Sequence, residues 1–374
     1  MNRNLYKYLY AVLPLALVFL VAGCTNGGED LCPDPDEGTA SYMMFRIVAP
    51  KAMVTKAVSR AVPDTDDALY WGDAYLSETG TAFDNALLRD GFNVFITRDD
   101  GTLITKLRDL ICFETAVGTD NVVFSFSGEI PQGDVETLKT NGNAKIHITA
   151  NCGSDISLAD GLSFSHAGQP SGTFTAIPMW GVKSFNFTTL QPGQNDAGEI
   201  WLLRAMAKVE IVIGTSSGDE PNFITALTSA SVANANTQGY VLPQAWRTVT
   251  DTKALSFENS LRALSSVGEI SGMTPTDDKT TDKIVFYLPE TANTDGTAAI
   301  TLNYATSLNG NESRSGVIKF GKYENGTATG THYDIVRNHL YRFEVSLSGA
   351  QEEINIHYTV CPLDNCPIEI PEFK

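Results

Sequence analysis

The sequence lacks an apolar run long enough to cross a membrane as a helix. Ala11–Val21 is almost wholly apolar, but it is shorter than the about 20 residues that a transmembrane helix needs. Basic residues are also few, with 26 Lys and Arg against 44 Asp and Glu and a formal net charge of −18. This balance argues against nucleic acid and anionic membrane surfaces as partners.

Histidine is scarce, and its spacing fits no metal or catalytic motif. The five histidines include no H-E-x-x-H arrangement and stand at His147, His166, His332, His339 and His357. Gly214–Gly218 reads G-x-S-x-G, but the following Pro221 would block the helix that a nucleophile elbow requires. We therefore predict a polar turn there, no catalytic residue and no cofactor.

Cysteine is also sparse, and its pattern does not predict a metal site. The segment Cys361–Cys366 reads C-P-L-D-N-C rather than C-x-x-C, and no second cysteine or histidine pair completes a zinc site. Cys361 and Cys366 could bridge a turn, and Cys112 could meet Cys152 across strands. With Cys32 these make five thiols beside Cys24, an odd number whose pairing cannot be deduced.

The N-terminus is typical of an exported lipoprotein. Arg3 and Lys7 precede the apolar run, which is the pattern of a secretory signal. The run closes with Leu20-Val21-Ala22-Gly23-Cys24, which looks like a bacterial lipobox. We predict a signal peptide over 1–23 and a lipid on Cys24. Removal of the signal peptide leaves 351 residues and changes the formal charge from −18 to −20, because two basic residues and no acidic ones are lost.

The next segments predict a tether, a strand and a linker. Residues 24–40 are rich in Gly, Pro, Asp and Glu, which indicates a flexible acidic tether. Residues 41–48 form a short apolar run that precedes Ala49-Pro50, so they predict a first strand. Residues 49–67 show little periodicity and carry Arg60, so they predict an exposed linker.

The remainder of the chain predicts an all-β protein with few short helices. Short apolar or alternating runs recur between Gly, Asn, Asp and Pro, and the helical segments expected are Phe83–Leu88, Gly133–Thr140 and Phe257–Val267. Such a pattern favours antiparallel β-sandwiches over a βαβ fold. Residues 191–198 have no apolar side chain larger than alanine, so we place a boundary there. The predicted domains are 41–190 and 199–374.

Three segments carry a more specific signal. They are Ile177-Pro178-Met179-Trp180-Gly181, Leu203-Arg204-Ala205-Met206-Ala207-Lys208-Val209-Glu210-Ile211 and Tyr333-Asp334-Ile335-Val336-Arg337-Asn338-His339-Leu340-Tyr341-Arg342-Phe343. In this order, and with the lipobox, they resemble the fimbrillin family of Bacteroidota, the lipoprotein-derived subunits of type V pili. Independently of the family, Asn338 suits left-handed backbone angles and Arg337 suits loop carbonyls.

The resemblance implies two tandem transthyretin-like β-sandwich domains and assembly by strand exchange. In the family's scheme an arginine-specific protease removes the first strand, and a strand of another subunit fills the groove. Cleavage between Arg60 and Ala61 would match this scheme, whereas Arg46 lies inside the strand and is a poorer candidate. The donor would come from region 354–374, with candidates Ile354, Ile356, Tyr358, Val360, Ile368 and Ile370. Pro362 and Pro367 cannot donate to a ladder, which leaves shaft, tip and accessory roles open.

We therefore expect a non-enzymatic subunit of a surface pilus that supports adhesion. Its expected partners are other pilus subunits, the maturation protease and the outer membrane, through the lipid on Cys24. A glycan-binding surface lipoprotein is the alternative, with a stacking platform formed by Trp71, Trp180, Trp201 and Trp246. An extracellular hydrolase is a third reading, for which paired carboxylates leave no local signature.

Overall fold

The computed structural model describes most of the chain that follows the N-terminal segment. The described residues are 40–50, 83–88, 91–117, 121–153, 156–165, 176–214, 221–252, 261, 266–276, 282–293, 295–308, 312–348 and 354–362. The predicted signal peptide, Cys24, the tether, Arg60 and Ala61 lie outside them. None of the helices in the described part has the length and hydrophobicity to cross a membrane.

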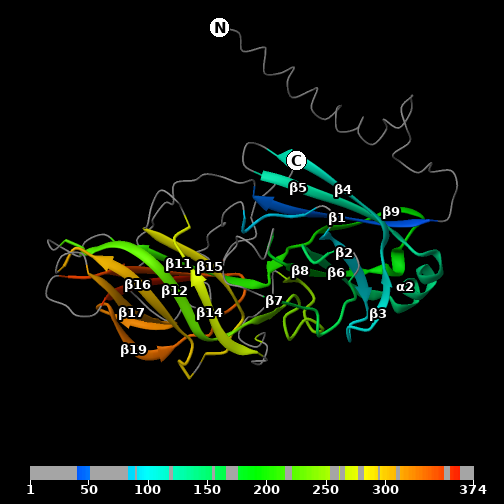
Figure 1. The fold of residues 1–374 in the computed structure, drawn as a ribbon. Helices are drawn as coiled ribbons and strands as arrows, with labels where there is room; N and C mark the ends of the chain where they lie inside the picture. The colour runs from blue at the N-terminus through cyan, green and yellow to red at the C-terminus, as the bar shows by residue number, and fades with distance from the viewer. Residues whose placement is uncertain are drawn as a thin grey trace, which may run out of the picture.

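The first half of the chain folds into a β-sandwich (Figure 1). Its strands are β1 (Ser41–Pro50), β2 (Asn93–Thr97), β3 (Leu103–Lys106), β4 (Arg108–Val117), β5 (Asn121–Ile130), β6 (Asn143–Ala150), β8 (Met179–Asn186), β9 (Gly193–Glu199) and β10 (Leu203–Arg204). One sheet has the order β4-β5-β1-β9 and the other β10-β8-β6-β2-β3. The chain passes from one sheet to the other between β3 and β4 and between β9 and β10, so the edge strands join the sheets on both sides.

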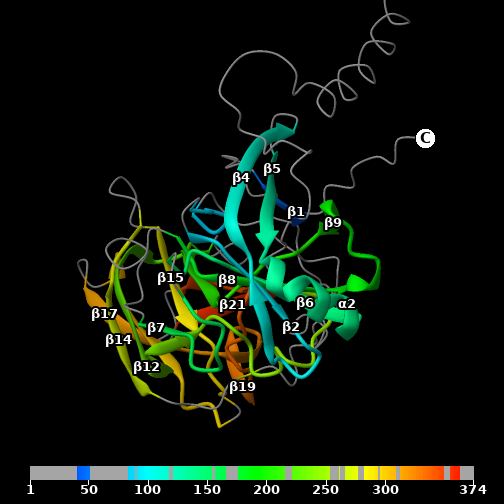
Figure 2. The ribbon, with the colours of Figure 1, turned by 90° about the vertical axis from the view of Figure 1, so that its right-hand side faces the viewer.

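The core of this sandwich lies between the two sheets. Alternating side chains of β1 and β5 meet those of β2 and β6, because successive strand residues face opposite sides. The buried cluster includes Phe45, Phe126, Val94, Ile146 and Ile148. Figure 2 shows the β4–β5 hairpin rising above the other labelled strands, with β1 beside β5.

The described part of the first sandwich includes one short α-helix and two 3₁₀ turns. Besides the 3₁₀ turns Gln132–Asp134 and Phe187–Thr189, the helix α2 (Val135–Asn141) matches the expected Gly133–Thr140. Its buried residues are Val135 and Leu138. It ends at Gly142, whose φ of 75° is easily adopted by glycine at a helix C-terminus.

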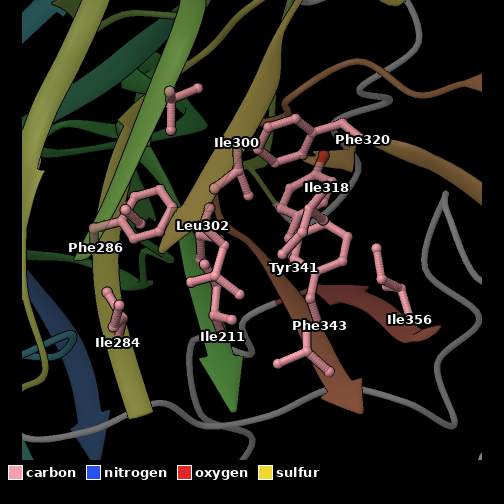
Figure 3. Packing of buried hydrophobic residues seen from close by; sticks show 14 of the residues in the cluster. Ile211, Ile284, Phe286, Ile300, Leu302, Ile318, Phe320, Tyr341, Phe343 and Ile356 are labelled. Carbon is pink, nitrogen blue, oxygen red and sulfur yellow. The ribbon is translucent and has the colours of Figure 1, made fainter. Parts of the chain in front are cut away.

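A second β-sandwich follows. Its strands are β11 (Met206–Ile213), β12 (Ile224–Asn236), β14 (Val267–Met273), β15 (Lys283–Pro289), β16 (Ala299–Thr306), β17 (Ser313–Lys319), β20 (His339–Ser346) and β21 (Asn355–Pro362). The sheet orders are β15-β11-β20-β21 and β14-β12-β16-β17, and β18 (Gly321–Glu324) pairs with β19 (Thr327–His332). Figure 3 shows the core between the sheets, where Ile211 and Phe286 face Leu302 and Ile318.

The two sandwiches adjoin, and we refer to residues 40–204 as the first half and to residues 205–362 as the second half. A small sheet joins them, because β7 (Ser163–Ser165) of the first half pairs with β13 (Gln238–Tyr240) of the second. The predicted all-β class with two sandwiches and few helices is confirmed. The sheets are not purely antiparallel, since β1 pairs in parallel with β9 and β11 with β20.

Two local expectations differ from the structure. Residues 191–198, expected to separate the domains, contain most of β9, which pairs with β1. An edge strand needs little apolar surface, and Ala197 is the buried residue of β9. The expected helix Phe257–Val267 is not supported where it is described, because Leu261 is irregular and Val267 begins β14. Pairing of β14 with β12 decides the conformation there.

Candidate functional site

Strand β1 lies inside its sheet, with a neighbour on each side. It runs antiparallel to β5 from the pair Ser41–Ile130 to the pair Pro50–Asn121. On its other edge it runs parallel to β9, from Ser41 opposite Gly193 to Arg46 opposite Glu199. The predicted first strand, residues 41–48, is therefore paired along its whole length.

The inward face of β1 forms part of the core of the first sandwich. Met43, Phe45 and Ile47 are exposed by 0%, 1% and 2%. The ring of Phe45 stacks on Phe126 of β5, with 5.1 Å between the ring centroids. The strand thus contributes three consecutive inward side chains to the core.

The outward face and the ends of β1 are held by polar contacts. The Ser41 hydroxyl donates to the carbonyl of Gln191 (3.0 Å), and the Asn195 side chain donates to the carbonyl of Tyr42 (3.3 Å). Arg46 and Asp196 form an ion pair at 3.7 Å, with both side chains well exposed. Such a surface pair contributes little to stability, so the ladders and the core hold β1.

The predicted donor residues fall into two groups. Strand β21 is an edge strand paired with β20. Its Ile356 and Val360, and Ile354 just before it, lie buried in the core of the second half, against which the partly buried Tyr358 packs. The first four candidates are therefore already packed within their own sandwich. Ile368 and Ile370 lie outside the described residues.

The three family-like segments come together where the two halves meet. Arg204 of β10 pairs with Met179 of β8, and its guanidinium donates to the Asn338 side chain (2.8 Å). The backbone N–H of Asn338 donates to the carbonyl of Met206 (2.8 Å). Gly181 is required by a close approach, since a Cβ there would lie 2.4 Å from the carbonyl oxygen of Trp201. These segments therefore lie together at the junction of the two halves.

The Arg337–Asn338 pair is confirmed in the role that the sequence predicts. Asn338 has a φ of 56°, in the left-handed region. The Arg337 guanidinium donates to the carbonyls of Val241 (2.7 Å) and Tyr240 (3.0 Å). It also forms a bidentate ion pair with the Glu290 carboxylate, at 2.5 and 2.8 Å. Because Arg337 is fully buried, these acceptors are needed to offset its desolvation.

A cluster of buried charges at the junction is the feature that sequence reasoning missed. The Asp84 carboxylate accepts hydrogen bonds from the Lys208 ammonium (2.8 Å) and the Tyr287 hydroxyl (2.6 Å). The Glu210 carboxylate forms ion pairs with Lys208 (3.2 Å), Lys283 (2.9 Å) and Arg342 (2.8 Å). The charged residues Lys208 and Glu210 within an apolar strand were a signal that buried partners exist.

Electrostatics keep both acids of this cluster ionised. Burial alone would raise the pKa of Asp84, but the charges of Lys208 and Arg204 outweigh burial and lower it. Burial likewise opposes ionisation of Glu210, yet Lys208, Lys283 and Arg342 lower its pKa to about 2. The folded state therefore favours the charged forms.

Other residue types singled out in the sequence lie in the interior. Trp180 and Trp246 are buried and Trp201 is partly buried, while Trp71 lies outside the described residues. The two buried tryptophans cannot form an exposed stacking platform. His147 is buried beside Trp180 and contacts the hydroxyl of Thr97 (3.0 Å), and burial lowers its pKa to about 3. Within the described ranges, no group of three or more His, Cys, Asp or Glu is placed to hold a metal ion.

Cys112 and Cys152 do not form a bridge with each other. Cys112 lies on β4, whereas Cys152 follows β6 in the opposite sheet. Cys152 is a free thiol that contacts the carbonyl of Ala150 (3.0 Å), and burial raises its pKa to about 12. The Cys112–Cys152 pairing that the sequence left open is therefore not formed.

Comparisons with known proteins place fimbrial proteins among the similar structures. No protein-family model matches this chain, and no curated protein matches it. Similar solved structures include the tip fimbrial protein Mfa3 of Porphyromonas gingivalis (12% identity, 86% of this chain and 99% of that one, TM-score 0.44). A fimbrial assembly protein of Parabacteroides distasonis is 15% identical, over 86% of this chain and 95% of that one, with a TM-score of 0.44. The fimbrilin FimA of P. gingivalis is 12% identical, over 86% of this chain and 98% of that one, with a TM-score of 0.43.

Replacing an inward side chain of β1 should destabilise the protein far more than replacing an outward one. Phe45→Ala is expected to lower the free energy of unfolding by about 3–5 kcal/mol, because it leaves a cavity in the core. Met44→Ala, on the opposite face, is the matched control and should cost about 1 kcal/mol or less. Urea unfolding followed by tryptophan fluorescence measures both. Equal losses would contradict the two-faced packing of β1.

Acid should weaken the junction in a defined pH window. Glu210 has an ordinary pKa of 4.5 and a folded-state pKa of about 2. A lowered folded-state pKa means that the contribution is fully present above pH 4.5 and is lost as the pH falls toward about 2. We expect the stability of Glu210→Gln to depend less on pH across this window than that of the wild type. Urea midpoints between pH 7 and pH 2 test this, and parallel curves would contradict it.

Proposed function

We propose that the protein is a subunit of a bacterial surface pilus that assembles by exchanging strand β1 for a strand of another subunit. The observation that carries this proposal is the place of β1, the first described strand of the chain, in the interior of its sheet. Its loss would leave unpaired edges on β5 and β9 and an apolar floor where Met43, Phe45 and Ile47 had packed. Such a groove accepts an extended strand whose alternate side chains are apolar.

The energetics favour replacement over simple loss. Burying each large apolar side chain contributes about 1.5–3 kcal/mol, and β1 buries three. The unpaired backbone groups along both edges of the groove would add to the cost of leaving it empty. A vacant groove is therefore a high-energy state that an incoming strand relieves.

Release of β1 requires cutting the chain after it. Arg46 is protected from proteolysis, because it is paired with both β5 and β9 and its carbonyl accepts a hydrogen bond from the N–H of Ile200 (3.0 Å). Proteases cleave exposed segments far more readily than paired strands. In the proposed scheme cleavage therefore falls between Arg60 and Ala61, and the segment that leaves carries both β1 and the lipid on Cys24.

The packing of β21 supports the C-terminal tail as the donor. Withdrawing β21 would remove Ile354, Ile356 and Val360 from the core of the second half, at a cost similar to that of removing β1. Residues 363–374 follow β21 and include the alternating Ile368 and Ile370. We propose that this tail enters the groove of the next subunit while β21 stays in place.

Export as a lipoprotein supplies the route in this scheme. The signal peptide over residues 1–23 and the lipid on Cys24 would deliver the precursor to the outer membrane. Folding of the precursor with β1 in place would keep the groove filled until a protease acts. The expected location is then the cell surface, first as an anchored precursor and later within the fimbrium.

Processing at Arg60 should trigger assembly. Incubation of the wild-type protein with an arginine-specific protease should give a product that begins at Ala61 and forms a ladder on a non-reducing gel without boiling. Arg60→Ala should remain intact and monomeric, whereas the matched control Arg46→Ala should behave as the wild type. N-terminal sequencing identifies the cut. A ladder formed by uncleaved Arg60→Ala would overturn the proposed trigger.

Changing the tail should remove the donor and leave the acceptor intact. The double variant Ile368→Asp and Ile370→Asp is expected not to form ladders by itself, because charged side chains cannot occupy the apolar floor. It should still accept the tail of wild-type protein, giving mixed dimers detectable by mass spectrometry. Glu369→Gln, between the two positions, is the control and should assemble normally. Normal ladders from the double variant would exclude the tail as donor.

A further inference from the structure

A short segment of the first half packs against strands of the second half. In the turn Phe83–Asn85 the Asp84 side chain is fully buried and accepts hydrogen bonds from Lys208 of β11 and Tyr287 of β15. The ring of Phe83 packs on that of Tyr287, with 5.3 Å between the centroids. Two strands of the second sandwich therefore hold this turn.

The same segment is also fastened to its own sandwich. The Asn151 side chain donates to the carbonyls of Ala86 (2.8 Å) and Ile177 (2.7 Å). Its oxygen accepts a hydrogen bond from the N–H of Leu88 (2.8 Å). Residues 83–88, which we call the front strap, therefore connect the two halves through side chains on both sides.

A second segment reaches in the opposite direction. Residues 241–252 follow β13 of the second half and lie against β6 and β8 of the first. Trp246 is buried against Trp180 and His147, with 5.3 Å between the His147 and Trp246 ring centroids. Its indole N–H donates to the Asp160 carboxylate (2.6 Å).

Backbone contacts continue along this second segment, which we call the rear strap. The Lys145 ammonium donates to the carbonyl of Arg247 (2.5 Å). The N–H of Ser184 donates to the carbonyl of Thr250 (2.7 Å), and the Thr252 hydroxyl donates to the carbonyl of Trp201 (2.6 Å). The rear strap is thus built into the outer face of the sheet that contains β6 and β8.

We infer that the two straps form a reciprocal clamp that makes the two sandwiches a single cooperative folding unit. Each half contains a buried piece of the other, so neither half can unfold without exposing apolar surface and unpaired charge in its neighbour. Segments that share buried contacts open together. The inference does not depend on strand exchange, but it has a consequence for it: a first half that has lost β1 would still be held by the second.

The clamp is tested on the full chain by calorimetry and hydrogen exchange. The wild type should unfold in one transition, with the calorimetric and van't Hoff enthalpies equal. Asp84→Asn removes one of the two carboxylates paired with Lys208 and breaks the front strap, and Trp246→Ala removes the buried side chain that anchors the rear strap. The double variant should unfold in two transitions, with the first half melting roughly 10 °C below the second, and amides of β6 and β8 should exchange faster than those of β11 and β20.

A matched control separates the clamp from a general loss of charge. Asp100→Asn removes an exposed carboxylate that accepts the N–H of Thr102 within its own turn, and it should retain the single transition. If the double variant does not fold, each single variant still tests the clamp through amide exchange of β6 and β8. Two transitions in the wild type, or equal exchange rates in both halves of the variants, would overturn the inference. Neither result bears on cleavage at Arg60 or on ladder formation, so the two proposals fail separately.

Discussion

Strand β1 satisfies two hydrogen-bonded ladders and part of a core at the same time, and the organisation of the first sandwich depends on this. An edge strand could leave and expose one row of backbone groups, but β1 lies between β5 and β9 and would expose two. Its three inward side chains would also leave their places in the core. The sheet is therefore complete only when an extended strand occupies that position.

The second sandwich contains the same local arrangement, but there the strand cannot leave. Strand β11 lies between an antiparallel neighbour, β15, and a parallel one, β20, just as β1 lies between β5 and β9. Its ends are continuous with β10 and with residue Gly214, and Lys208 and Glu210 bind it into the charged junction. In the proposed scheme, the equivalent position is thus occupied by a removable strand in one half and by a permanent strand in the other.

The sequence predicts strands that are rich in large apolar residues and misses those built from small or polar ones. The cores of β2, β5 and β6 follow from their apolar residues. The 13-residue β12 escapes notice because its side chains are mostly Ala, Ser, Thr and Asn, and small buried residues such as Ala230 and Ala235 carry little periodic signal. Asp84 could not be found either, because it lies in a turn and its partner Lys208 is 124 residues away. Pairing at such distances is a property of the fold.

In the proposed scheme, the difference in side chains between β1 and the proposed donor explains why cleavage would have to precede exchange. Strand β1 places Met43, Phe45 and Ile47 on the floor of the groove, whereas the tail between Pro367 and Pro371 has only Ile368 and Ile370 to place there. At about 1.5–3 kcal/mol for each buried side chain, a tail with two such residues cannot displace a covalently attached strand with three. Cutting the chain after β1 removes its advantage of effective concentration, since a released peptide is diluted. In this scheme the tail of a neighbouring subunit then competes with a released peptide rather than with an attached strand, and β1 serves as a provisional occupant of the groove.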